Sequence, residues 1–76
     1  MIDKKIYENI GQQIKELRKK AGVSQTDLAQ RINVKPSFIS IVENGDKISL
    51  SRLQQILDVL GYELSFQEKK TPLITA

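Results

Sequence analysis

The 76-residue sequence contains no cysteine, no histidine and no tryptophan. Without cysteine it can form neither a disulfide framework nor a thiolate metal site. Without histidine as well, a metal centre would have to be built from carboxylates alone. The sequence also has no glycine-rich loop of the kind that cradles phosphate groups. We therefore expect no enzyme, no catalytic residue, no metal and no cofactor.

Long apolar runs are missing too, so the sequence predicts no membrane-spanning helix. Residues 1–10, MIDKKIYENI, lack the continuous apolar core of a secretory signal, and we therefore expect a soluble, cytoplasmic protein.

A length of 76 residues predicts a single domain, which would be marginally stable alone and would gain from oligomerisation. The formal net charge of +3 favours an anionic partner only weakly.

Apolar residues recur every three or four positions from about Lys5 to Lys20, which predicts a first helix with one apolar stripe. The members of this stripe are Ile6, Ile10, Ile14, Leu17 and Ala21. Gly11 lies inside the helix and costs about 1 kcal/mol relative to alanine, so we interpret it as a point of close packing or slight irregularity. Gly22 is suited to the left-handed residue that ends a helix.

Residues 24–45 predict two short helices joined by a tight turn, an arrangement typical of a helix-turn-helix. Ser24 begins and caps the first helix of this pair, and Asn33 suits a left-handed turn after that helix. Pro36 opens the second helix, where its missing N–H needs no partner, and Gly45 closes that helix. Both helices have few apolar residues. They therefore need a supporting platform, and one polar face of the second is left in water.

A fourth helix begins after Ser49, which caps it, and ends at Gly61. Its wide apolar face consists of Leu50, Leu53, Ile56, Leu57 and Leu60. Capping and periodicity agree here, so this helix is the most strongly predicted element of the sequence.

After the fourth helix the periodicity changes to that of a strand, because Tyr62, Leu64 and Phe66 alternate with polar residues over about 62–67. A lone strand has no partner within its own chain. The same strand of a second copy, antiparallel about a two-fold axis, is the simplest partner. Residues 68–76 show no periodicity and are predicted to be a flexible tail after a domain of residues 1–67.

A resemblance to a known family is carried by IKELRKKAGVSQTDLAQRINVKPSFISIVENG, continued by SLSRLQQILDVLG. These residues resemble the Cro and phage-repressor type of helix-turn-helix, often called the Xre family. The resemblance implies an all-α, lambda-repressor-like DNA-binding bundle of four to five short helices. The ending GYELSFQEK resembles that of HipB-like antitoxins, which implies a C-terminal strand that pairs across a homodimer.

The resemblance also implies that the second helix of the pair enters the major groove of double-stranded DNA. The base-facing residues would be Lys35, Pro36, Ser37, Ser40 and Ile41. Lys35 can donate to guanine or to a nearby phosphate, the two serines can bond to base edges, and Ile41 can touch a thymine methyl. None of them is a bidentate reader, so we expect modest direct discrimination supplemented by DNA shape. Pro36 and Ile41 depart from the polar residues often found there.

The predicted phosphate contacts are Gln25, Asn44, Lys47 and Arg52. Gln25 stands where a helix begins, and free N–H groups there favour an anion. In the family, the positions matching Gln25 and Asn44 commonly contact phosphate. Lys47 adds charge from the next loop, and Arg52 is a weaker candidate. Simple capping by Gln25 and a helix-end turn at Asn44 remain open as alternatives.

Two further sets of residues are assigned structural roles. Arg18 and Glu43 match family positions that form a partly buried ion pair between the first helix and the end of the recognition helix. Tyr62, Leu64 and Phe66 are the predicted dimer interface, together with the apolar face of the fourth helix. The alternative is that these three residues only cover their own helices.

The leading functional hypothesis is a dimeric transcriptional repressor that binds a double-stranded operator with an inverted repeat. More narrowly, it is a HipB-like antitoxin that regulates its own toxin–antitoxin operon. The alternative is a protein-interaction module whose main role is to neutralise a HipA-like kinase toxin. RNA binding is disfavoured, because Tyr62 and Phe66 fit a core or an interface better than a base-stacking platform.

Overall fold

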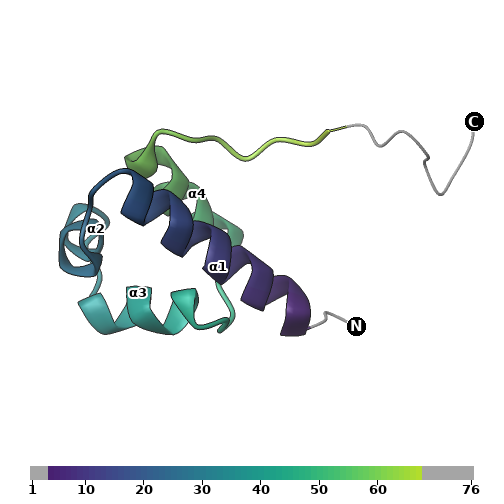
Figure 1. The fold of residues 1–76 in the computed structure, drawn as a ribbon, viewed down its shortest axis with the longest axis horizontal. Coiled ribbons are helices and arrows are strands. Elements are labelled where there is room, and N and C mark those ends of the chain that lie inside the picture. Colours follow the sequence, from purple (N-terminus) through teal and green to yellow (C-terminus); the bar gives the residue numbers. More distant parts are fainter. Residues whose placement is uncertain (1–3, 68–76) are drawn as a thin grey trace, which may run out of the picture.

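The computed structural model describes residues 4–67, and over that range the chain forms four helices. They are α1 (Lys4–Lys20), α2 (Gln25–Arg31), α3 (Pro36–Glu43) and α4 (Leu50–Leu60). In Figure 1, α1 crosses in front of α4, α2 closes the left side and α3 runs along the bottom. The predicted all-α bundle is confirmed, with four helices in the described part of the chain.

The helix ends follow the capping chemistry of the sequence. The Ser24 hydroxyl accepts the N–H of Asp27 at 3.0 Å, and the Ser49 hydroxyl accepts the N–H of Arg52 at 3.2 Å. Pro36 is the first residue of α3. Asn33, with φ of 60°, is the one residue other than glycine in the described range that has a positive φ. Its left-handed conformation turns the chain from α2 into α3, as predicted.

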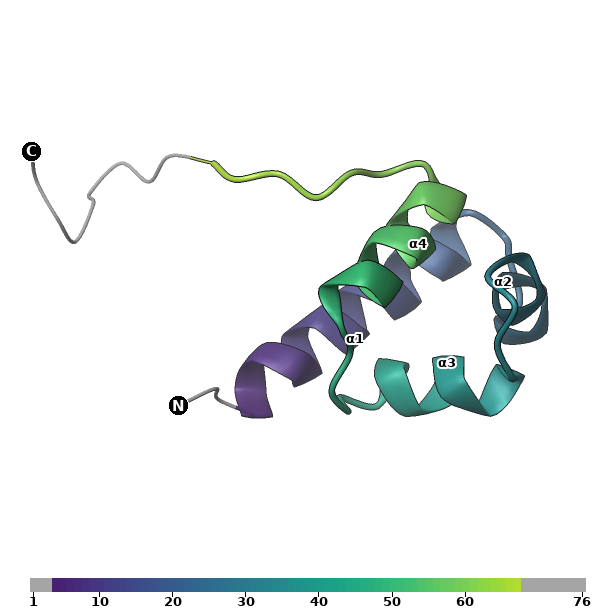
Figure 2. The ribbon, with the colours of Figure 1, turned by 180° about the vertical axis from the view of Figure 1, so that it is seen from behind.

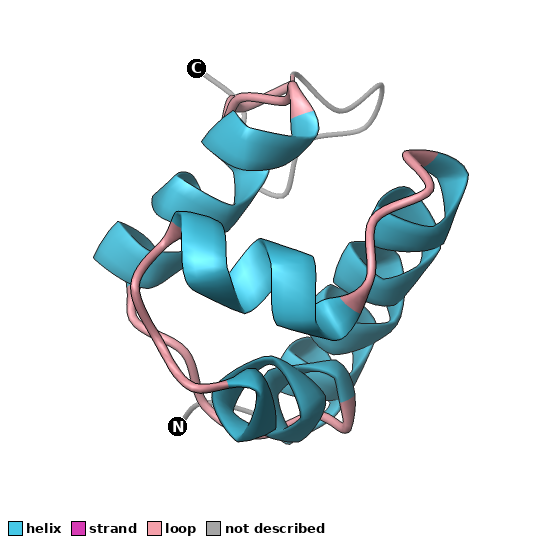
Figure 3. Cartoon of the chain, turned by 90° about the vertical axis from the view of Figure 1, so that its left-hand side faces the viewer, coloured by secondary structure: helices cyan, strands magenta, loops and turns pink. Residues whose placement is uncertain are grey.

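The four helices share one apolar core. α1 packs against α3 and α4, and α2 packs against the same two helices, an arrangement seen from behind in Figure 2. α2 is viewed end-on in Figure 1 and from its side in Figure 3, so it crosses α3 steeply. The buried apolar side chains are Ile14, Leu28, Ala29, Ile32, Ile39, Val42, Leu53, Ile56 and Leu60. The platform expected beneath α2 and α3 is therefore formed by α1 and α4.

Two large apolar residues expected on inward faces are exposed instead, as is Ala21, which follows the last residue of α1. Ile6 of α1 is 53% exposed and Leu50 of α4 is 71% exposed. Both lie in the first turn of their helix. The periodicity places them on the apolar stripes of their helices, but in both helices the stripe is exposed at the first turn. None of the helices within residues 4–67 is long and apolar enough to cross a membrane.

The strand predicted over 62–67 is not formed as a paired strand in this single chain. Residues 62–67 continue from Gly61 as an extended segment along the top of the bundle in Figure 1, with no strand assigned in the described range. A strand needs a neighbouring backbone to donate to and accept from, and one copy of the chain offers none here. The tail predicted over 68–76 lies outside the described residues.

Candidate nucleic-acid interface

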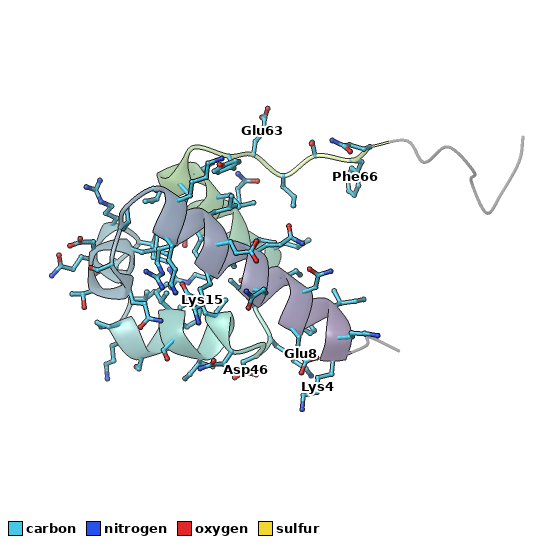
Figure 4. All side chains as sticks on the ribbon, viewed as in Figure 1. Lys4, Glu8, Lys15, Asp46, Glu63 and Phe66 are labelled. Carbon is cyan, nitrogen blue, oxygen red and sulfur yellow. The ribbon has the colours of Figure 1, made fainter. Side chains whose placement is uncertain are left out.

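α3 has one face in the core and the other in water. At most 1% of the surface of Ile39 and of Val42 is exposed, and these two residues anchor the helix on the bundle. On the opposite side the helix presents side chains along the lower edge of the molecule in Figure 4. Of the five predicted base-facing residues, Ser40 is half-buried and the other four are exposed: Lys35, Pro36, Ser37 and Ile41.

An ion pair between α1 and α3 fixes the carboxyl end of this helix. Arg18 Nε donates to Glu43 Oε2 at 2.6 Å and Arg18 Nη2 donates to Glu43 Oε1 at 3.1 Å, which gives a bidentate contact. Both side chains are buried, with 10% and 3% of their surface exposed. Arg18 Nη1 also donates to the carbonyl of Val23 at 2.9 Å. One guanidinium thus holds α1, the α1–α2 turn and α3 in a fixed arrangement.

The same contact further favours the protonated form of Arg18. The hydrogen bond that Arg18 donates to the Glu43 carboxylate raises the pKa of Arg18, burial of the guanidinium opposes this, and the negative charge of Glu43 adds to the rise. The net direction is upward, so the guanidinium of Arg18 stays protonated. No buried side-chain nitrogen or oxygen in the described range lacks a hydrogen-bond partner. The cost of burying two charges is therefore offset by full pairing.

Gln25, predicted as a phosphate contact, is bonded within the protein. It is half-buried at the start of α2, and its Nε2 donates to Glu43 Oε1 at 3.1 Å. An amide nitrogen carries two N–H donors, so this bond uses one of them. Sequence reasoning missed this contact because the two residues are 18 positions apart and no local pattern links them.

The other predicted phosphate contacts differ in their surroundings. Asn44 and Lys47 are exposed, Asn44 at the end of α3 and Lys47 in the loop that follows. Arg52 is half-buried, and its Nη1 donates to the Ile32 carbonyl at 3.2 Å and to Gln55 Oε1 at 2.9 Å. Its guanidinium carbon lies 6.0 Å from the centre of the Phe38 ring. Arg52 thus satisfies a carbonyl at the end of α2.

The predicted dimer residues lie away from α3. The extended segment that carries them runs along the top of the bundle in Figure 1, whereas α3 lies at the bottom. Tyr62 is 41% exposed, Leu64 is 46% exposed and Phe66 is fully exposed. The alternative in which all three cover their own helices is therefore wrong for Phe66.

Within residues 4–67, no cluster of three or more carboxylates could hold a metal ion.

Two short helices that cross steeply around a left-handed asparagine, on a platform of two further helices, define the helix-turn-helix class. A family profile described as helix-turn-helix matches residues 14–67 of this chain. The chain therefore belongs to the helix-turn-helix family, as the resemblance predicted.

Comparison with known proteins places the chain beside transcriptional regulators. Over 61 residues it is 36% identical to an uncharacterized helix-turn-helix-type transcriptional regulator of Acanthamoeba polyphaga mimivirus. The match covers 80% of this chain and 27% of that protein, so the chain spans about a quarter of the length of this relative.

Two solved structures share the fold. The clp gene regulator ClgR from Corynebacterium glutamicum superposes with a TM-score of 0.73 at 28% identity, over 75% of this chain and 62% of that chain. HppE, solved with iron(II) and substrate, gives a TM-score of 0.71 at 24% identity, over 75% of this chain and 33% of that chain. At that identity, the second likeness shows the fold alone. The helix-turn-helix bundle is thus a shared architecture, and its function has to be argued from the site.

Proposed function

We propose that this chain binds double-stranded DNA as a transcriptional repressor, with α3 in the major groove. The observation that supports this most directly is the two-sided character of α3. Ile39 and Val42 are buried, while Ser37 and Ile41 of the same short helix are exposed, as is Lys35 immediately before it. A helix supported on one side and free on the other fits a groove about 12 Å wide.

The residues around α3 are proposed to set its depth and register on the duplex. Asn44 and Lys47 are exposed beyond its carboxyl end, where they can donate to backbone phosphates. Gln25 has one amide N–H for a phosphate while the other remains on Glu43. Arg52, which donates to the Ile32 carbonyl and to Gln55, adds positive charge at the opposite, carboxyl end of α2.

We further propose that two copies pair through the extended segment. Its apolar residues suggest a register, because antiparallel pairing of Leu64 with Leu64 of the partner subunit also places Tyr62 opposite Phe66 of the partner subunit. All three apolar residues then lie on one face as cross-strand pairs. Beneath this segment lies a groove of about 130 Å³, lined by Ile10, Gln13, Ile14, Leu17, Leu53, Leu57 and Leu64.

The dimer would give two recognition helices on a fixed axis. Such a pair selects inverted half-sites about one helical turn, roughly 34 Å, apart. Each copy alone makes few phosphate contacts, so coupling two copies raises the affinity without any new contact to DNA. This is why an operator with an inverted repeat is the proposed ligand.

A narrower role as a HipB-like antitoxin that represses its own operon is supported by the ending GYELSFQEK. The alternative main role, neutralising a HipA-like kinase toxin, is compatible with DNA binding, and the exposed Phe66 supports some protein contact at that end. A kinase-like protein encoded beside this gene, and its inhibition by the purified chain, would be expected for either role. If no kinase-like protein is encoded beside this gene, the proposed role is that of a repressor without a toxin partner.

The experiment that tests DNA binding is a salt series. Affinity is measured for a random duplex and for the region upstream of the gene, at several salt concentrations. We expect log K to fall linearly with log salt for both duplexes, with an additional salt-insensitive preference for the upstream region. Equal affinity for both duplexes would contradict a sequence-specific repressor.

A further inference from the structure

A hollow beside the carboxyl end of α3 carries polar groups that the sequence analysis did not single out. It has a volume of about 300 Å³ and is lined by Lys4 and Tyr7 of α1 and by Gly45, Asp46 and Lys47 of the α3–α4 loop. In Figure 4, Lys4 lies at the lower edge of the bundle, the edge along which α3 runs. The hollow therefore continues the outward face of α3.

The two walls of this hollow are held at a fixed separation. Gly45 has φ of +99°, and a Cβ atom placed on it would lie 2.8 Å from Cγ of Glu8 and 3.2 Å from its Cα. The α3–α4 loop therefore rests directly on α1, with no room for a side chain between them. A site formed in this way before a ligand arrives loses little conformational freedom on binding.

The groups in the hollow are mostly donors. Lys4 and Lys47 are exposed and carry ammonium groups, and Tyr7 contributes a hydroxyl. The Asp46 carboxylate is turned onto the loop itself, where its Oδ1 accepts the N–H of Lys47 at 2.8 Å. The lining thus carries two positive side chains and one carboxylate that is bonded to its own loop, while the carboxylate of Glu8 lies beside it. Phosphate oxygens can accept bonds from all three donors.

The position of the hollow relative to α3 identifies the anion. The eight residues of α3 extend over about 12 Å, which is close to the width of the major groove of B-DNA. When the amino end of α3 meets base edges, its carboxyl end reaches the sugar–phosphate backbone that borders the groove. The hollow lies just beyond that end.

We propose that this hollow binds a backbone phosphate of the duplex, with Lys4 and Tyr7 of α1 as contacts in addition to Lys47. The inference rests on the proposed function, because it assumes that α3 enters the major groove. It gives the first two turns of α1 a role in DNA binding beyond their support of the bundle.

The test compares charge-removing variants in the salt series with random and upstream duplexes. Lys4→Gln should weaken binding to both duplexes by the same factor, about eightfold at 0.1 M salt for each copy bound, and should reduce the slope of log K against log salt by about 0.9. Tyr7→Phe should weaken both duplexes by a smaller factor. Glu8→Gln, which removes a negative charge beside the hollow while keeping the size of the side chain, should tighten both.

Lys20→Gln is the matched control, because Lys20 is an exposed lysine at the opposite end of α1, about 24 Å from Lys4. Lys20→Gln also removes one positive charge, but it should change the slope of log K against log salt far less than Lys4→Gln does. Equal effects of Lys4→Gln and Lys20→Gln would overturn the hollow as a phosphate site. If the unmodified chain itself shows no salt-dependent binding to any duplex, the proposed function fails instead, so the two failures are distinguishable.

Discussion

Gly11 of α1 lies against the backbone carbonyl of Val42 in α3, and the two helices meet there without a side chain between them. A Cβ atom on Gly11 would overlap the Val42 oxygen and would lie 3.0 Å from the Glu43 oxygen. Gly11 is buried, yet α1 continues through it without a break. The glycine therefore sets how closely α3 approaches its support, and hence how far the opposite face of α3 stands out of the bundle.

Gly11→Ala should destabilise the protein although alanine is the better helix former. The added methyl gains about 1 kcal/mol of helix propensity, but it meets backbone atoms that cannot rotate away. Overpacking of this kind costs about 1–3 kcal/mol, and contact with backbone places this site at the upper end, so we expect a net loss of about 2 kcal/mol. Urea denaturation measures it, with exposed Gln12→Ala in the next position as the control, expected to stay within about 0.5 kcal/mol. A Gly11→Ala protein as stable as the control would contradict the close contact.

Local chemistry could be predicted from the sequence, and packing across helices could be predicted only in part. The caps at Ser24 and Ser49 and the left-handed Asn33 depend on neighbours within a few positions, so the residues themselves indicate them. Ile6 and Leu50 are exposed although they fit the apolar periodicity, because periodicity defines a face and not the length of the helix that another element covers.

The candidate site shows the same division. The outward residues of α3 follow from helical spacing and from the family resemblance. The bond from Gln25 to Glu43 and the hollow between Lys4 and Lys47 join segments that are far apart in sequence. Nothing in the local pattern of either segment signals the other, so these contacts become visible only once the helices are packed.

The buried pair between Arg18 and Glu43 predicts a strongly non-additive set of variants. Arg18→Met or Glu43→Leu alone would leave one buried charge without its partner, which costs about 3–5 kcal/mol. The double variant replaces both charges by apolar side chains of similar size and should be far less destabilised than either single variant. A double-mutant cycle by urea denaturation measures the coupling. A double variant destabilised by the sum of the two single losses would show that Arg18 and Glu43 are not coupled.

Lys35 and Gln25 should affect DNA binding in different ways. Lys35 is exposed at the start of α3, so Lys35→Ala should reduce the preference for the upstream duplex over random DNA, by about 1–3 kcal/mol if it contacts a guanine. Gln25→Ala should weaken both duplexes alike, since a phosphate contact carries no sequence information.

A stability measurement has to accompany Gln25→Ala, because this variant also loses the bond to Glu43, worth about 0.5–1.5 kcal/mol. Binding is therefore compared at temperatures where both variants are fully folded. A Lys35→Ala protein with an unchanged preference would show that α3 does not read bases through its amino end.

The proposed dimer register can be tested with single cysteines, since the chain has none of its own. If Leu64 pairs with Leu64 of the partner subunit, Leu64→Cys places two sulfur-bearing side chains directly opposite each other, where antiparallel Cβ atoms lie about 4.5–5.5 Å apart. Mild oxidation should then give a covalent dimer rapidly, because this separation is close to that of a disulfide. Ser65→Cys is the control, because in this register Ser65 faces Glu63 of the partner subunit and should cross-link slowly.

Phe66→Ala separates the register from dimerisation itself. Phe66 is fully exposed in the single chain, so its loss should leave the stability of one copy unchanged to within about 0.5 kcal/mol. In the dimer it would pack on Tyr62 of the partner subunit, and its removal should raise the dimer dissociation constant about tenfold or more, measured by sedimentation equilibrium. A dimer that forms normally in Phe66→Ala and cross-links faster through Ser65→Cys than through Leu64→Cys would place the two-fold axis elsewhere on the segment. A chain that sediments as a monomer at all concentrations would rule out the pairing, because the exposed apolar segment would then have no partner in a second copy.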